Sequence, residues 1–300
     1  MSELNRAISS YSSGDRNRRV GSLVPGWVWL VLPYALALAL FLAAPLANIA
    51  LLSFYTHSAD RIWLPVLTLD NYRQLLGYYF LNITLRTLRV GAITTVLCAL
   101  LGYPLAYYLA RCSRRALAIA MFIMMMPLMV SAVVGAFGWI VILGRNGLIN
   151  SLLDALGIAW RIDVLNTETA VAIALVQFLL PLMVLPLMAS IEKIPLRLEE
   201  VSVNLGASVL VTWRRVLLPL SLPGLISGVL LCFTIAISVV VTPALLGGRQ
   251  GRMFGNEIYD QVITAYNWPF ASSLALVLVS MTVLAIALSL FGSRVLRRSG

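Results

Sequence analysis

The chain alternates between long apolar stretches and shorter polar segments. A membrane-spanning helix needs about 20 mostly apolar residues. Six stretches meet this length, at roughly residues 26–52, 84–110, 117–143, 169–190, 223–246 and 271–293. In the hydrocarbon of a bilayer the backbone must satisfy its own hydrogen bonds, and an apolar helix does so. The pattern therefore predicts an all-α integral membrane protein of about six transmembrane helices, with one membrane domain from residue 25 to residue 300.

The first 24 residues differ from the rest of the chain, because they are polar and contain four arginines but no apolar core. A cleavable signal peptide has an apolar core of about 7 to 15 residues, which is shorter than the first apolar stretch here. We therefore expect residues 1–24 to form a flexible cytoplasmic tail, and the first apolar stretch to be retained as a membrane helix.

The basic residues predict how the chain is oriented. Cytoplasmic loops of membrane proteins carry an excess of Lys and Arg. With the N-terminus inside, 14 of the 22 Lys and Arg residues lie on the cytoplasmic side and 8 lie outside. An even number of spans then places both termini in the cytoplasm. The formal net charge of +10 is mainly a signal of topology, and we expect no nucleic-acid partner.

Composition supports a membrane location and offers little for catalysis. Hydrophobic residues make up 60% of the chain and charged residues 11%, with a mean hydropathy of +0.92, whereas soluble proteins carry about 25% charged residues. The three cysteines, Cys98, Cys112 and Cys232, share no metal-ligand spacing, and the single histidine, His57, has no partner motif. We expect these residues to be structural, and we expect no metal site.

The chain lacks the residues that would power transport by itself. A Walker A phosphate loop needs a lysine after glycine in G-x-x-x-x-G-K-S/T, but the only lysine, Lys193, follows Glu192. The apolar stretches hold no clear carboxylate of the kind that proton-coupled carriers use. We expect a protein that is not an enzyme and binds no cofactor. A channel or secondary carrier is the second interpretation, and a membrane-embedded enzyme ranks below it.

The internal segment at about residues 191–222 predicts two short helices with a break between them. Pro195 suits the first turn of a helix, Gly206 permits a sharp turn, and Ser208 can cap the second helix. Pro219 and Pro223 are expected to end that helix before the fifth apolar stretch, because proline removes a backbone donor.

The spacing within this segment carries a family resemblance. The pattern is Glu200-x5-Gly206-x9-Val216-x-Leu218-Pro219. It resembles the Glu-Ala-Ala loop of permeases of ATP-binding-cassette (ABC) importers, with Val201 and Ser202 in place of the two alanines. The alternative is an ordinary amphipathic loop helix, and for the glutamates alone that alternative would be preferred.

The resemblance implies partners and a role for the loop. In the family the loop forms a coupling helix that docks on an ATPase subunit. By position, the coupling residues here are Glu199, Glu200, Gly206, Ala207 and Ser208. The implied partners are an ABC ATPase dimer that binds ATP and magnesium, a second permease, an extracytoplasmic solute-binding protein and membrane lipid.

Further segments narrow the resemblance. Their order along the chain is similar to that of spermidine/putrescine-type permeases, over roughly residues 25–295. These segments are Gly102–Tyr107, Gly144–Asn150, Val241–Gly248 and Asn267–Phe270. The resemblance implies a multi-pass protein of the bacterial inner membrane that imports a small solute, with a polyamine as the first candidate. An opine, a phosphonate or another small charged solute is the alternative.

Polar residues in the apolar stretches are candidates for lining the route of the solute. Thr234, Ser238 and Thr242 recur every four residues and should share one stripe of the fifth span. Gln177 is the only amide in the fourth span, and a buried amide needs a hydrogen-bond partner. These groups either line the pathway or bond to neighbouring helices, and the sequence leaves both readings open.

The last external segment contains Glu257, Tyr259 and Asp260. Carboxylates and aromatic rings hold ammonium groups, so these residues are candidates for guiding a cation inward. The alternative is a solvated surface on which the binding protein docks.

Overall fold

The structure is a computed structural model that describes residues 26–58, 61–158 and 161–298. The chain divides into two compact units, Met1–Asn48 and Ile49–Gly300, and each is described by itself. In the first unit the described residues belong to one helix, α2 (Gly26–Leu52), which matches the first predicted span and ends in the second unit. The predicted tail at residues 1–24 lies outside the described residues.

The second unit is almost entirely helical. It begins with a small antiparallel hairpin in which Tyr55 pairs with Leu67 and Ser58 with Ile62. The elements in order are β1 (Tyr55–Ser58), β2 (Ile62–Leu67), α3 (Asp70–Leu75), α4 (Tyr78–Arg111), α5 (Arg114–Met129), α6 (Ala132–Leu143), α7 (Leu148–Ala155), α8 (Glu168–Ile191), α9 (Leu196–Asn204), α10 (Val209–Thr212), the π-helical turn η1 (Trp213–Leu217), α11 (Leu218–Ser238), α12 (Val241–Leu246), α13 (Phe254–Ile263) and α14 (Trp268–Arg298).

The number of candidate spans agrees with the sequence. Among the described residues, six helical segments are long and apolar enough to cross a membrane: Val31–Leu52, Tyr78–Arg111, Ala132–Ala155, Glu168–Ile191, Val209–Ser238 and Trp268–Ser289. The prediction of an all-α membrane protein with about six transmembrane helices is confirmed.

The core of the second unit lies between α4, α8 and α11. Leu175, Leu179 and Met183 of α8 are fully buried and pack with Cys98 of α4 and Cys232 of α11. All three cysteines are free, and Cys98 and Cys232 are buried.

Glycine allows two of these helices to approach closely. A Cβ at Gly224 of α11 would lie 2.5 Å from the carbonyl oxygen of Pro186 on α8, and a Cβ at Gly228 would lie 2.7 Å from the sulfur of Met183. Small residues at such crossings bring helix backbones together where lipid supplies no hydrophobic driving force. The pair α8–α11 is therefore the rigid centre of this unit.

Two predicted spans are interrupted, which corrects the prediction of continuous helices at 117–143 and 223–246. The third is divided into α5 and α6 by an extended residue, Val130. The fifth is divided into α11 and α12 by Val239, which is also extended. In an unbroken helix the ring of Pro243 would crowd the carbonyl of residue 239, which favours a break there. Proline alone does not determine the break, because Pro223 remains inside α11.

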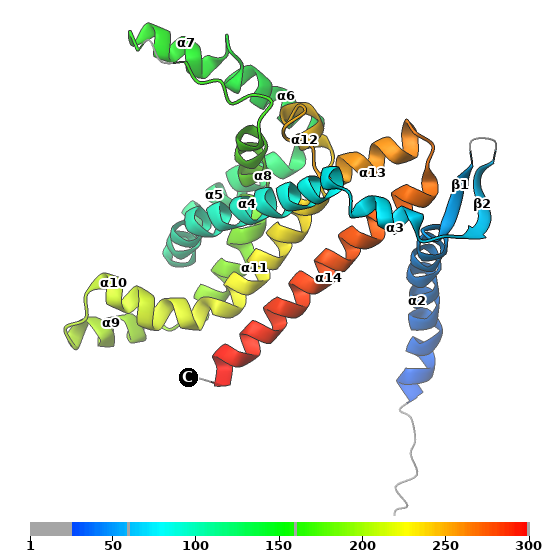
Figure 1. Cartoon of the computed structure of the whole chain (residues 1–300). Coiled ribbons are helices and arrows are strands. Elements are labelled where there is room, and N and C mark those ends of the chain that lie inside the picture. The colour runs from blue at the N-terminus through cyan, green and yellow to red at the C-terminus, as the bar shows by residue number, and fades with distance from the viewer. Residues whose placement is uncertain (1–25, 59–60, 159–160, 299–300) are drawn as a thin grey trace, which may run out of the picture. The chain divides into compact units, whose positions relative to one another are not determined.

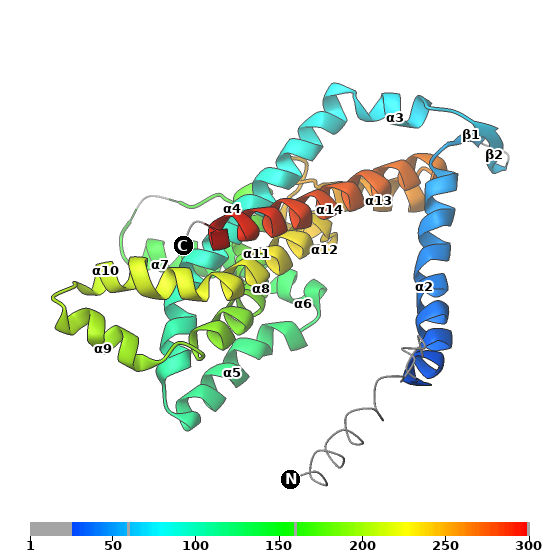
Figure 2. The ribbon, with the colours of Figure 1, turned by 90° about the horizontal axis from the view of Figure 1, so that it is seen from below.

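The two ends of the helical core carry different elements. Figures 1 and 2 show α9 and α10 at one end of α8 and α11, with α12 and α13 toward the opposite end. The internal loop and the last external segment therefore lie at opposite ends of the core, as the predicted topology requires.

Candidate functional site

The internal loop folds as two helices joined by a tight turn, as predicted. Pro195 occupies the N-cap position of α9, and Gly206 follows the helix with a φ of +82°. Residues other than glycine rarely adopt this left-handed conformation. The hydroxyls of Ser202 and Thr212 lie 2.9 Å apart and join α9 to α10 across the turn. Ser208 occupies the predicted N-cap position of α10, but its side chain makes no capping hydrogen bond there.

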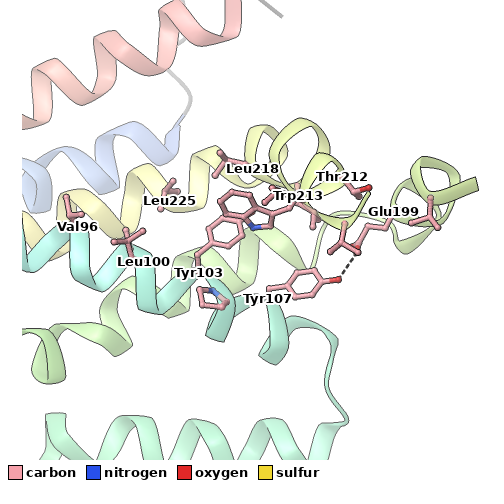
Figure 3. A pocket seen from close by; sticks show the side chains of 15 residues that line it. Val96, Leu100, Tyr103, Tyr107, Glu199, Thr212, Trp213, Leu218 and Leu225 are labelled. Atoms are coloured by element: carbon pink, nitrogen blue, oxygen red, sulfur yellow. Dashed lines mark hydrogen bonds between the residues drawn. The ribbon is translucent and has the colours of Figure 1, made fainter. Parts of the chain in front are cut away.

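Glu199 connects α9 to the end of α4. The Tyr107 hydroxyl donates to one carboxylate oxygen at 2.7 Å, and the Arg111 guanidinium donates to the other at 2.7 Å (Figure 3 draws the first of these bonds). Arg111 also donates to the carbonyl of Ile194 at 2.9 Å. The side chains of Arg111 and Glu199 are only 18% and 15% exposed. Glu199 therefore fixes the loop to the second span.

A cavity of about 950 Å³ lies between the loop and the helices α4 and α11. Tyr103 and Trp213 lie in its wall and meet edge to face, with ring centroids 5.0 Å apart. The Tyr103 hydroxyl is hydrogen-bonded to Ser221 of α11 at 2.8 Å. Most of the wall is apolar, and its polar end is formed by Tyr107 and Glu199 (Figure 3).

The tip of the loop is exposed and largely apolar. Leu205 is 83% exposed, and Glu200, Gly206 and Ser208 are also exposed, whereas Ala207 is partly covered. Of the two adjacent glutamates, only Glu200 faces outward. The loop therefore presents an exposed apolar surface at its tip.

The second loop helix continues into the fifth span without a break, so the prediction that Pro219 and Pro223 end it is wrong. From Val209 the chain passes through α10, η1 and α11 to Ser238. In η1 the Leu218 N–H donates to the carbonyl of Trp213, five residues earlier. This wider turn lies directly before Pro219 and provides room for a residue that has no N–H to donate.

The predicted stripe of hydroxyl residues is also broken. Thr234 and Ser238 lie on the last turns of α11, where the Ser238 hydroxyl donates to the Thr234 carbonyl at 2.8 Å. Thr242 lies beyond the break, on α12, and lines a different space. The expectation of one continuous stripe is therefore wrong, because the helix ends at Ser238.

Two of the pathway candidates do come together. Gln177 of α8 and Thr242 of α12 line one cavity of about 210 Å³ at the two helix breaks. Its wall includes Trp139 of α6, whose indole N–H donates to the Gln177 amide oxygen at 2.6 Å. The arrangement places an amide, a hydroxyl and an aromatic ring at the interruption of two membrane helices.

The external candidates form an ion-pair cluster around Arg252. Glu257 is 4% exposed, accepts a hydrogen bond from Tyr79 at 2.8 Å and lies 3.2 Å from the Arg252 guanidinium. Asp260 pairs with the same arginine. Tyr259 and Asp260, but not Glu257, line a cavity of about 650 Å³. Arg252 compensates both carboxylates, so the cluster is not an open anionic surface.

The sequence of this chain matches a family model over residues 76–297, and the family is described as the binding-protein-dependent transport system inner membrane component. The chain belongs to this family.

Individual relatives agree with this assignment. The permease is 32% identical to the spermidine/putrescine transport system permease protein PotB of Haemophilus influenzae, over 87% of its own length and 92% of the relative. It is 34% identical to PotB of Escherichia coli K12, covering 87% of this chain and 95% of that one. It is also 34% identical to the molybdenum transport system permease protein ModB of Mycobacterium bovis, covering 87% and 92%.

Solved structures show the same fold. A bacterial ABC transporter that imports the acidic polysaccharide alginate aligns with a TM-score of 0.69 at 18% identity, over 91% of this chain and 96% of that one. The methionine ABC transporter MetNI aligns with a TM-score of 0.55 at 18% identity, over 77% and 99%. At this identity the likeness concerns the fold alone.

Family membership confirms the main functional predictions. The permease is a multi-pass protein of the bacterial inner membrane and a subunit of a binding-protein-dependent importer. It is not the enzymatic subunit, since ATP hydrolysis belongs to a separate ATPase in these systems.

Four residues of these sites were missed from the sequence: Tyr107, Arg111, Trp139 and Arg252. A signal existed for the first two, because they are four residues apart at the end of a span and so share a face toward the loop. Trp139 bonds to Gln177, which is 38 residues later, so the pair could be found only after the helices between them had been placed. Arg252 lies only 5 and 8 residues before Glu257 and Asp260, and their opposite charges were the signal that could have found it.

Proposed function

We propose that the permease forms one half of a solute pathway. Its partner is a second permease, either a related chain or another copy. A solute-binding protein docks outside, an ABC ATPase dimer binds inside, and the termini and the loop at about residues 191–222 face the cytoplasm. The greater number of basic residues on that side supports this orientation.

The loop transmits movement of the ATPase to the membrane helices. The observation that carries this proposal is that the loop is fixed at two points. Glu199 holds α9 to α4, and α10 continues through η1 into α11. A displacement of the exposed tip at Glu200, Gly206, Ala207 and Ser208 therefore moves two spans as a rigid body. Glu199 positions the loop, and its neighbours at the tip contact the ATPase.

The transported solute is a polyamine such as spermidine or putrescine. The relatives at 32–34% identity named for polyamine transport support this assignment. Gln177 and Thr242 lie on the route, and Tyr259 and Asp260 lie at its outer mouth. The chain itself holds no cofactor, and ATP and magnesium are bound by the ATPase.

The decisive experiment measures ATP hydrolysis by the reconstituted complex of permeases, ATPase and binding protein. Spermidine, putrescine, an opine, a phosphonate and molybdate are each added with the binding protein. We expect a polyamine to stimulate hydrolysis several-fold, because solute-loaded binding protein stabilises the state in which the ATPase closes.

The outcomes separate the alternatives. Stimulation of ATP hydrolysis by another solute, and not by a polyamine, would support the importer function but reject a polyamine as the transported solute. Solute uptake that persists without any ATPase would instead indicate a channel or secondary carrier, and would overturn the coupling role of the loop.

A further inference from the structure

The cavity of about 210 Å³ is built where two membrane helices are interrupted. Val130 and Ser131 lie between α5 and α6, and Val239 and Val240 lie between α11 and α12; all four line the cavity. Interrupted helices are tolerated at membrane depth only where they are buried in protein or line a cavity that a polar solute or water enters. In transporters such breaks mark solute sites.

The amide of Gln177 has a defined orientation. An indole N–H only donates hydrogen bonds, so the Gln177 group at 2.6 Å from Trp139 is the carbonyl oxygen. This bond occupies the single polar group of Trp139. The part of Trp139 that is left to line the cavity is its aromatic ring, whose face carries partial negative charge.

Thr242 is a second, independent indication of a ligand. It is only 9% exposed, and it lines the cavity. Its hydroxyl makes no hydrogen bond to any residue in the described part of the chain. The oxygen is not among the fully enclosed polar atoms that lack a partner in the described residues, which agrees with its opening onto the cavity. The hydroxyl is therefore available to a group that enters the cavity.

The remaining wall favours one chemical class. Among the residues that the structure describes, no charged side chain lines the cavity, and most of the wall consists of alanine, valine, proline and phenylalanine side chains. Methylene groups pack well on such a wall, and an ammonium group is attracted to the face of a tryptophan and to hydroxyl oxygens. An anionic solute would meet the negative ring face without any basic side chain to compensate its charge.

We propose that this cavity is a transit site for an alkylammonium group, with the Trp139 ring and the Thr242 hydroxyl as its contacts and Gln177 as the residue that positions the ring. The inference rests on the proposed function, which it extends to the chemistry of one site inside the membrane. Because no carboxylate is present, binding is weak enough for the solute to leave again, as conduction requires.

The test uses the complete complex in proteoliposomes with spermidine as the probe, and it measures both uptake and ATP hydrolysis. Trp139→Leu removes the ring, whereas Trp139→Phe keeps a ring and removes the N–H. We expect Trp139→Leu to lower the spermidine taken up per ATP by about 30-fold, the size of a desolvated cation–π contact. Stimulation of the ATPase by loaded binding protein should persist, since docking occurs elsewhere. Trp139→Phe should retain most uptake.

A double-variant comparison tests the role of Gln177. Gln177→Leu should lower uptake no more than Trp139→Phe does and should add nothing to that variant, because both substitutions remove the same hydrogen bond. Trp63→Leu, which changes an aromatic residue on β2 outside the cavity, is the matched control and should leave the uptake per ATP unchanged.

Three results would overturn the inference. One is an equal loss of uptake in Trp139→Phe and Trp139→Leu, and another is a parallel fall of uptake and ATP hydrolysis. The third is a wild-type complex that is stimulated by an anionic solute and not by spermidine, which would leave the importer intact. Failure of the proposed function looks different, since the wild-type complex would then show no stimulated ATPase with any solute.

Discussion

At the residue scale, two adjacent glutamates have different surroundings. Glu199 lies between Tyr107 and Arg111 of α4, whereas Glu200 is exposed at the loop surface. Breaking a shielded ion pair from one side leaves the other charge without compensation, which costs more than the pair itself contributes. The Nε of Arg111 already lacks a partner among the described residues, so the guanidinium depends strongly on Glu199.

Glu199→Leu should therefore destabilise the complex by about 2–3 kcal/mol, somewhat below the effect for a fully buried pair. Thermal unfolding of the purified complex, followed by tryptophan fluorescence, measures this change. The matched control is Glu200→Leu, which should change stability by less than about 0.5 kcal/mol, as surface substitutions do. Adding Arg111→Met to Glu199→Leu should restore most of the loss. Equal destabilisation by the two single variants would contradict the anchor role.

At the element scale, local residues predicted the loop but not the breaks in the spans. Pro195 and Gly206 determine backbone conformation within a few residues, so α9 and its turn were predictable. The breaks at Val130 and Val239 lie inside apolar runs, where hydropathy is the same on both sides. The prediction that Pro219 ends the second loop helix was wrong because a π-helical turn directly before this proline accommodates it, and such a turn depends on packing.

The turn at Gly206 should be sensitive to backbone substitution. Proline requires a φ near −65° and has no N–H, but Gly206 has a φ of +82° and its N–H donates to Val203. Gly206→Pro should abolish uptake while leaving the amount of membrane-inserted protein unchanged, as measured by transport assay and by immunoblot of washed membranes.

The control for this variant is a second glycine with the same conformation. Gly157 has a φ of +73° and, like Gly206, no neighbour within 4 Å of a Cβ. Both Gly206→Ala and Gly157→Ala carry a similar strain of about 1–2 kcal/mol, but only the former lies in the loop and should lower uptake. Normal uptake by Gly206→Pro would refute the coupling role of this turn.

At the scale of the whole molecule, the hydropathy pattern was sufficient for the fold class, because bilayer thickness fixes the length of each span. The partners could be anticipated only through the spacing of the loop, since one chain does not contain the surfaces it meets. The tip of the loop is the surface on which we expect a partner, because Leu205 is 83% exposed on a segment predicted to lie in water.

If this tip docks on the ATPase, Leu205→Asp should weaken the complex of permease and ATPase. Burying a leucine contributes about 1.5–3 kcal/mol, so its loss corresponds to at least about a 10-fold weaker affinity. Titration of purified ATPase onto the permeases in nanodiscs measures this affinity directly.

Leu156→Asp is the matched control, because Leu156 is 73% exposed and lies on the predicted external side. A weaker complex with Leu156→Asp alone would mean that the orientation is inverted, and unchanged affinity in both variants would exclude the loop as the docking surface. Weakening by Leu205→Asp alone would support both the cytoplasmic side of the loop and its role in coupling.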